Sequence, residues 1–188
     1  MHRHAGVKTN LGKVKVWSRG GGDAPEGLES AWQGRKNECE NGLVVLGTPL
    51  GSKAFVEAFA EERLRKEAQL LDELPKLGDL QCAWALLSQS AVLRANHTVR
   101  ILPPTSSQMY AQKHDAAVWK TFCKMFGVGA LENDKLAKYV ATLPGRLGGL
   151  GLRAAVRTAP SAYWASWVNT LRVFSQKTPL FCAWVLRG

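Results

Sequence analysis

The sequence predicts an α+β fold that is mainly α, with one small antiparallel pair of β-strands followed by a bundle of helices. The change of pattern falls in Gly42–Phe59, where the short apolar run Leu43–Leu46 is typical of a strand. Gly47–Gly51 places two glycines around Thr-Pro and predicts a tight turn, after which Ser52 is a suitable N-cap for a helix. Beyond this point apolar residues mostly repeat with helical spacing. We therefore expect strands before residue 52 and helices after it.

The first strand is expected at Lys13–Trp17, because Lys and Val alternate there. Its natural partner is Leu43–Leu46, which would give an antiparallel pair with Val14 and Val16 facing the helices. The glycine-rich segment 18–41 would form a flexible connection between the two strands.

Helices are predicted wherever apolar residues recur every three or four positions. Pro75 ends the first helix, Asp79 caps the second, and Gly127 ends the third. The predicted segments are 53–74, 80–102, 107–126, 133–143, 152–159 and 161–175, and Pro160 separates the last two. The expected organisation is a β region at 1–51, a helical region at 52–127 and a basic helical region at 128–188.

Positive charge is concentrated toward the end of the sequence. The 188 residues carry a net charge of +10, and residues 135–188 hold eight Lys and Arg with no Asp or Glu. A long acid-free block is typical of proteins that bind a polyanion such as nucleic acid. Arg146, Arg153 and Arg157 are candidate phosphate contacts in this block. The alternative is a generally basic surface without a specific partner.

A second candidate phosphate-binding face lies in the second predicted helix. Arg94, His97 and Arg100 recur every three residues, so a helix would place them along one side. Three lysines of the next helix would complete a groove that follows phosphates: Lys113, Lys120 and Lys124. An ordinary solvated face is the alternative.

The four cysteines are isolated in the sequence and lack the spacing of zinc ligands. Their apolar neighbours predict buried, reduced thiols and therefore an intracellular protein, nuclear or cytoplasmic. The opening residues lack the apolar core of a secretory signal, and the longest apolar run, Leu180–Leu186, is far shorter than the roughly 20 residues that span a bilayer. We expect a soluble protein with no membrane partner and an unknown oligomeric state.

Two short motifs invite an enzymatic interpretation that their surroundings contradict. Gly149–Ala154 matches the loose dinucleotide pattern GxGxxA, but a predicted helix precedes it and no acidic residue follows to bind a ribose. His114 and Asp115 are adjacent on a helix and therefore point in different directions, which argues against a catalytic pair. We expect no catalytic residue, no metal site and no cofactor.

Several stretches, in their order along the chain, resemble the reverse transcriptases of non-LTR retrotransposons. Gly6–Trp17 is similar to motif D of these enzymes, and Gly42–Ser52 is similar to the motif E strand and turn of the primer grip. Later stretches resemble the thumb-side helices of the same family: Arg94 to Pro104, His114-Asp115, Leu143–Leu152 and Ala162–Trp167. Together these similarities extend over residues 5–172.

The resemblance implies the edge of a polymerase palm followed by a helical thumb. It implies that Lys13 lies near the phosphates of the incoming nucleotide, and that Leu46 and Gly47 lie beside the primer terminus. RNA or DNA would then be the partner, and Mg²⁺ would be a cofactor only of a complete enzyme.

The sequence departs from the family in the carboxylates that hold the two metal ions needed for polymerisation. The family supplies them from a motif A aspartate and a YxDD hairpin upstream of motif D, whereas the five aspartates of this sequence are unpaired. We therefore expect a fragment of an RNA-directed DNA polymerase that is inactive alone and retains at most nucleic-acid binding. The alternatives are a helical protein-interaction module, docking through its tryptophan-rich C-terminal segment, and a truncated element without function.

Overall fold

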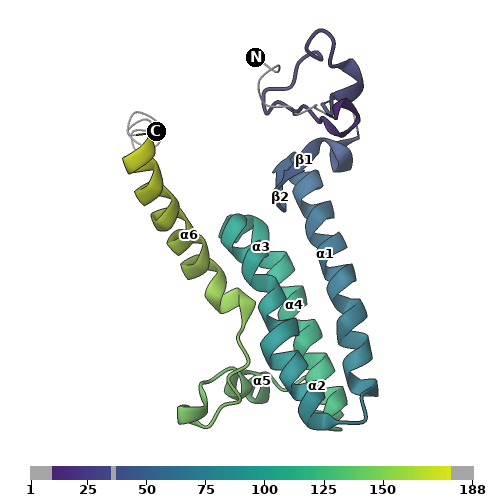
Figure 1. Cartoon of the computed structure of the whole chain (residues 1–188). Coiled ribbons are helices and arrows are strands. Elements are labelled where there is room, and N and C mark those ends of the chain that lie inside the picture. Colours follow the sequence, from purple (N-terminus) through teal and green to yellow (C-terminus); the bar gives the residue numbers. More distant parts are fainter. Residues whose placement is uncertain (1–9, 35–36, 179–188) are drawn as a thin grey trace. The chain divides into compact units, whose positions relative to one another are not determined.

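A computed structural model describes residues 10–34 and 37–178 (Figure 1). The chain divides into two compact units, and the boundary between them falls between Phe59 and Ala60. A two-stranded antiparallel sheet precedes a series of helices, which confirms the mainly helical α+β class. The strands and α-helices are β1 (Gly42–Val45), β2 (Thr48–Gly51), α1 (Lys53–Glu73), α2 (Leu80–Leu86), α3 (Ala95–Ile101), α4 (Pro104–Met125), α5 (Lys135–Ala141) and α6 (Ala155–Lys177).

In the first unit, β1 and β2 form a hairpin, so the predicted pairing of Leu43–Leu46 with Lys13–Trp17 is wrong. Leu46 (φ 50°) and Gly47 (φ 80°) both have positive φ, as a two-residue type I′ turn requires. The residues predicted to complete the turn, 48–51, are instead the second strand, and Val45 pairs with Thr48. A local hairpin closes a much shorter loop than residues 18–41 would, so its conformational entropy cost is lower.

The segment Lys13–Trp17 forms no strand of its own. Lys13 ends a short 3-10 turn that begins at Leu11, and Val16 makes an isolated parallel bridge to Trp32. Two backbone hydrogen bonds of 2.9 Å hold Val16 in this bridge.

The helix boundaries follow from the capping residues. The Ser52 hydroxyl accepts a hydrogen bond from the backbone N–H of Phe55 at 3.1 Å, and the Asp79 carboxylate accepts two from the first turn of α2. Gly127 has φ 67° directly after the end of α4, which is the left-handed conformation of a terminating glycine. These three sequence predictions are confirmed.

Two predicted helices differ from the observed ones. The segment 80–102 is divided into α2 and α3 by a π-helical turn at Leu87–Ala91 and a 3-10 turn at Val92–Arg94. Conversely, α6 is one helix that continues through Pro160. Proline inside a helix costs about 3 kcal/mol, and the burial of Ala155 and Ala159 against neighbouring helices opposes this cost.

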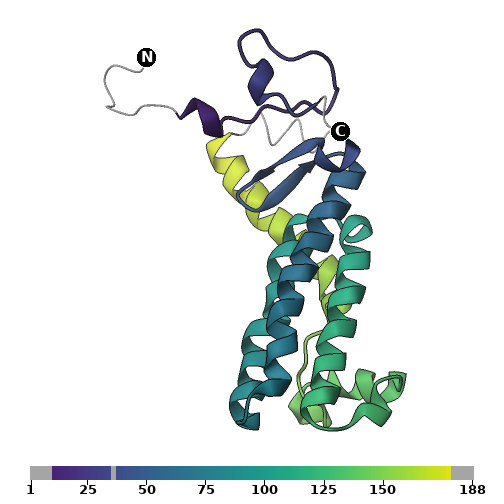
Figure 2. The same cartoon turned by 90° about the vertical axis from the view of Figure 1, so that its right-hand side faces the viewer.

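The second unit packs around two hydrophobic clusters. Figure 1 shows α3 and α4 side by side, and Figure 2 shows α4 alongside α1, whose residues from Ala60 onward belong to this unit. One cluster, rich in large side chains, comprises Leu71, Leu74, Leu87, Ala91, Val92, Val118, Trp119, Phe122, Cys123, Ala141 and Leu152. The other, mostly of small residues, comprises Ala60, Ala95, Val99, Tyr110, Ala111, Ala155 and Ala159. Residues on both sides of position 127, where a domain boundary was expected, share the first cluster.

The cysteines do not all occupy the core, contrary to prediction. Cys123 is buried, whereas Cys39 and Cys82 are exposed, and Cys182 lies outside the described residues. Within residues 10–34 and 37–178, no helix combines the length and apolar character needed to cross a bilayer.

Candidate nucleic-acid interface

One side of α3 and of the turn before it is basic and exposed. It carries Arg94, His97 and Arg100. The opposite side of α3 carries the buried residues Ala95 and Val99. The three-residue spacing therefore separates a solvent-facing basic side from a core-facing apolar side. None of these three side chains is within salt-bridge distance of a carboxylate among the described residues.

Helix α6 packs on α3 and α4 and adds further positive charge. Arg157 and Arg172 are exposed on α6, and neither α3 nor α6 contains an Asp or Glu. The small residues at the α3–α6 contact, including Ala95 and Ala159, allow the two backbones to approach closely. Arg94 and Arg100 lie on the solvent-facing side of α3 and the turn before it, and Arg157 and Arg172 lie on α6. We call these four exposed side chains together the arginine surface.

The loop before α6 folds back onto α5. The backbone N–H groups of Leu150 and Leu152 both donate to the carbonyl of Ala141 at 3.2 Å. Gly149 is required at its position, because a Cβ there would lie 2.1 Å from the carbonyl oxygen of Leu143. Gly149 thus serves close backbone packing, whereas Gly148 and Gly151 have positive φ. The burial of Leu152 anchors the loop in the core.

Arginines 146, 153 and 157 occupy three different settings around this loop. Arg146 is exposed in the 3-10 turn Gly145–Leu147. Arg153 lines a polar hollow with Ser88 of the π-helical turn. The Nη2 of Arg157 donates a hydrogen bond of 3.1 Å to the carbonyl of Thr142.

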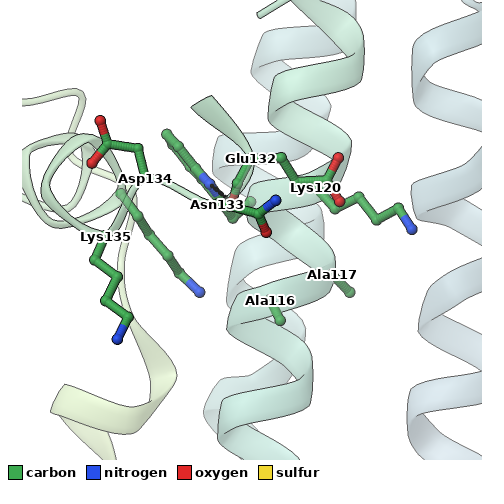
Figure 3. Close-up of a pocket in the computed structure, with 9 residues that line it drawn as sticks. Ala116, Ala117, Lys120, Glu132, Asn133, Asp134 and Lys135 are labelled. Atoms are coloured by element: carbon green, nitrogen blue, oxygen red, sulfur yellow. Dashed lines mark hydrogen bonds between the residues drawn. The ribbon is translucent and has the colours of Figure 1, made fainter. Parts of the chain in front are cut away.

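Two of the three lysines of α4 lie beside other elements, and the third, Lys124, is exposed in the last turn of α4. Lys113 pairs with Glu61 of α1, and so it faces α1. Lys120 lines a hollow of about 400 Å³ beside α5, together with residues 116, 117, 119, 132–135 and 138 (Figure 3). In that view the side chains of Lys120 and Lys135 point in different directions, and their ammonium groups lie far apart. Three lysines and two acidic residues line the hollow, so its charge gives little preference for an anion.

The residues that the sequence analysis placed at a primer terminus belong to the first unit. Lys13 is exposed at the end of its 3-10 turn. Leu46 is 94% exposed at the tip of the β1–β2 hairpin, beside Gly47. An apolar side chain presented in this way can contact a partner. Within the described ranges, no group of three or more His, Cys, Asp or Glu side chains is arranged to hold a metal ion.

A buried polar cluster joins α1 to α4 and was missed by the sequence analysis. Glu67 is 5% exposed, and its carboxylate accepts a hydrogen bond of 2.6 Å from the Tyr110 hydroxyl. The other carboxylate oxygen lies 2.9 Å from Nδ1 of His114, which is 1% exposed. Burial raises the pKa of the Tyr110 hydroxyl, and the hydrogen bond to Glu67 adds to this effect. One sequence signal was available, because Glu67 follows Ala60 and Leu64 on the core-facing side of the helix.

The neighbouring Asp115 has a different task. Its carboxylate accepts hydrogen bonds from the first backbone N–H groups of α6, those of Ala155 and Val156. His114 faces the core and Asp115 faces α6, so each of these adjacent residues has a structural role of its own.

Comparison of the chain with protein-family models, curated proteins and solved structures finds no match.

Proposed function

We propose that residues 80–178 bind RNA or DNA, in the manner of the thumb of a non-LTR retrotransposon reverse transcriptase. The arginine surface carries the proposal. Three of its guanidinium groups lie on α3 and α6, and that of Arg94 lies on the 3-10 turn directly before α3. The two helices pack against each other and contain no acidic residue. Asp115 is the acidic side chain that reaches α6, and both of its oxygens are occupied by backbone N–H groups.

Phosphate neutralisation would supply most of the binding free energy. Each arginine that contacts a phosphate releases condensed counterions, and this contribution does not depend on base sequence. The guanidinium group also matches the geometry of two phosphate oxygens. We therefore expect binding that tolerates many sequences and weakens steeply with salt.

Primer extension by this chain is not expected, because its aspartates form no pair that could hold two metal ions. In this proposal the chain binds a template–primer. Lys13, Leu46 and Gly47 would contact the primer terminus only in a complete polymerase. The test of this part is incubation with template–primer, four nucleotides and Mg²⁺ or Mn²⁺. Robust extension after rigorous removal of host polymerases would contradict it.

Binding is tested by fluorescence anisotropy of a labelled template–primer. The double variant Arg94→Ala/Arg100→Ala should bind several-fold more weakly than the wild type. The matched control is Lys66→Ala/Lys76→Ala, which removes two positive charges whose side chains are each 66% exposed at the acidic helix α1 and the turn after it. Equal losses in the two variants would contradict a role of the arginine surface.

A specific feature also favours the second candidate, a protein-interaction module. An apolar groove of about 590 Å³ lies between the end of α4 and α5. Its lining includes the exposed side chains of Phe126, Leu131 and Leu136. A protein partner in this groove would bind with little salt dependence, because the contacts are apolar. The Leu136→Ser variant would then lose the partner while keeping nucleic-acid affinity.

A further inference from the structure

The outer side of α6 exposes a row of large apolar side chains. Trp164 is 64% exposed, Trp167 is 38% exposed and Val168 is 65% exposed. The buried residues of this helix, Ala155 and Ala159, lie on the other side, where α6 packs on α3 and α4. Exposed tryptophans cost solvation free energy, so a row of them indicates a surface that a partner covers.

The two indole rings are held in place by a third ring. Tyr163 packs edge-to-face against Trp164, with ring centroids 5.7 Å apart, and against Trp167, with centroids 6.3 Å apart. Both contacts have an interplanar angle of 72°. Such packing restricts the side-chain rotamers, which lowers the entropy that a ligand must remove on binding.

Arginines share this outer side with the tryptophans. At 100° per residue, Arg157 lies about 20° from the direction of Trp164, and Arg172 lies about 40° from that of Val168. The two arginines are separated by about 22 Å along the helix axis. The hydrogen bond from Arg157 to the carbonyl of Thr142 uses one of five guanidinium N–H groups, which leaves the others for a ligand.

This mixing of charge and aromatic rings selects among possible partners. A helix that lies in a membrane surface keeps its cations on the side opposite its apolar residues. Of the three cations of α6, Arg157 faces the same way as Trp164, Arg172 lies about 80° from Trp164, and Lys177 lies toward the opposite side. A cation therefore lies within the row of apolar side chains, and the helix has no acidic residue. Single-stranded nucleic acid offers the complementary pattern, because its phosphates are negative and its base faces are open to stacking.

We propose that the outer side of α6 is a stacking site for unpaired bases. Trp164 and Trp167 stack on bases, while Arg157 and Arg172 bind phosphates on either side. This inference rests on the proposed nucleic-acid binding and specifies its form: a single strand is preferred here, because a duplex covers its base faces by internal stacking.

The test compares two labelled oligonucleotides of equal length, one with normal bases and one in which abasic sites replace them. Both carry the same phosphates, so only stacking distinguishes them. The wild type should bind the normal strand roughly tenfold or more tightly than the abasic strand. Trp164→Ala/Trp167→Ala should bind both strands equally, at the affinity of the wild type for the abasic strand.

The matched control is Val173→Ala on the same helix. Val173 is 49% exposed and lies nine residues from Trp164, on the opposite side of the helix. This variant should keep the full preference for the normal strand. Thermal melting of each variant checks that it folds. The affinities of the wild type for the two strands provide a test that does not depend on any variant.

The possible results separate this inference from the proposal on which it rests. If the wild type binds both strands equally and in a salt-dependent way, base stacking on α6 is wrong while phosphate binding stands. If it binds neither strand, both are wrong. If the double tryptophan variant keeps its strand preference but loses binding to phosphatidylserine vesicles, the surface serves a membrane and the stacking site is contradicted.

Discussion

Asp115 of α4 caps a helix that begins 40 residues later, by accepting a hydrogen bond of 2.7 Å from the backbone N–H of Ala155. Its second oxygen accepts a hydrogen bond of 3.1 Å from the next residue, Val156. Ala154 occupies the N-cap position of α6 and has no side-chain acceptor, so the cap comes from another helix. The carboxylate charge also matches the positive end of the helix dipole. The placement of the arginines and tryptophans of α6 therefore depends on Asp115.

Replacing Asp115 with Ala should lower the free energy of unfolding by about 1–2 kcal/mol, because two N–H groups at the start of α6 lose their acceptor. Asp115→Asn retains an acceptor and should lose less. Urea denaturation followed by circular dichroism measures the difference. Asp72→Ala removes an exposed carboxylate from α1 and is the control. Equal stability of the two alanine variants would show that the cap contributes nothing.

Replacing Glu67 with Ala should destabilise the second unit by about 3–5 kcal/mol. The change leaves the Tyr110 hydroxyl and His114 buried without their shared acceptor. Thermal or urea unfolding measures the loss. Glu62→Ala on the same helix removes an exposed partner of Arg65 and should have little effect. A Glu67 variant as stable as the Glu62 variant would mean that the buried cluster is not formed.

The stability of the protein should decrease in acid partly because of Glu67. Burial by itself raises the pKa of this carboxyl, but hydrogen bonds from His114 and Tyr110 and the charge of Arg63 outweigh it and leave the pKa below its ordinary value. A lowered pKa stabilises the folded state above the unfolded value of about 4.3, and this contribution is lost as the pH falls through the folded value. Between pH 7 and pH 3, the free energy of unfolding should therefore decrease less for Glu67→Gln than for the wild type. An equal decrease in the two proteins would contradict this assignment.

A methyl group at Gly149 should disturb the loop that leads into α6. Its Cβ would meet the carbonyl oxygen of Leu143 at 2.1 Å, so the backbone would have to move, at a cost of about 1–3 kcal/mol or more. Gly145→Ala, in the same loop, is the control, because nothing lies within 4 Å of a Cβ there. Circular dichroism during thermal unfolding compares the two. A melting temperature that is the same in both variants would contradict the close packing.

Local signals predicted most of the helices. Ser52, Asp79 and Gly127 act through neighbours a few residues away, so their capping roles could be inferred from sequence. The hairpin was missed for a local reason. Leu at a positive-φ turn position is unfavourable, and Pro49 in a strand is tolerated here because a two-stranded sheet has free edges.

The sequence predicted those parts of the candidate site whose residues recur with the spacing of a helix. The exposed side of α3 follows from the interval between Arg94 and Arg100. The partners of Glu67 and Asp115 lie 40 or more residues away, and no local pattern identifies them. The common outer side of Trp164 and Arg157 was also missed, because Pro160 had divided α6 into two predicted segments.

The salt dependence of binding tests the central claim most directly. The whole chain is titrated with labelled single-stranded RNA and DNA and with template–primer over a range of salt concentrations. We expect the logarithm of the association constant to fall linearly with the logarithm of salt concentration, and the slope to become shallower by about 1 for each of Arg94 and Arg100 replaced by Ala. Binding that does not change with salt, or a slope unaffected by these substitutions, would contradict a nucleic-acid interface on α3 and α6.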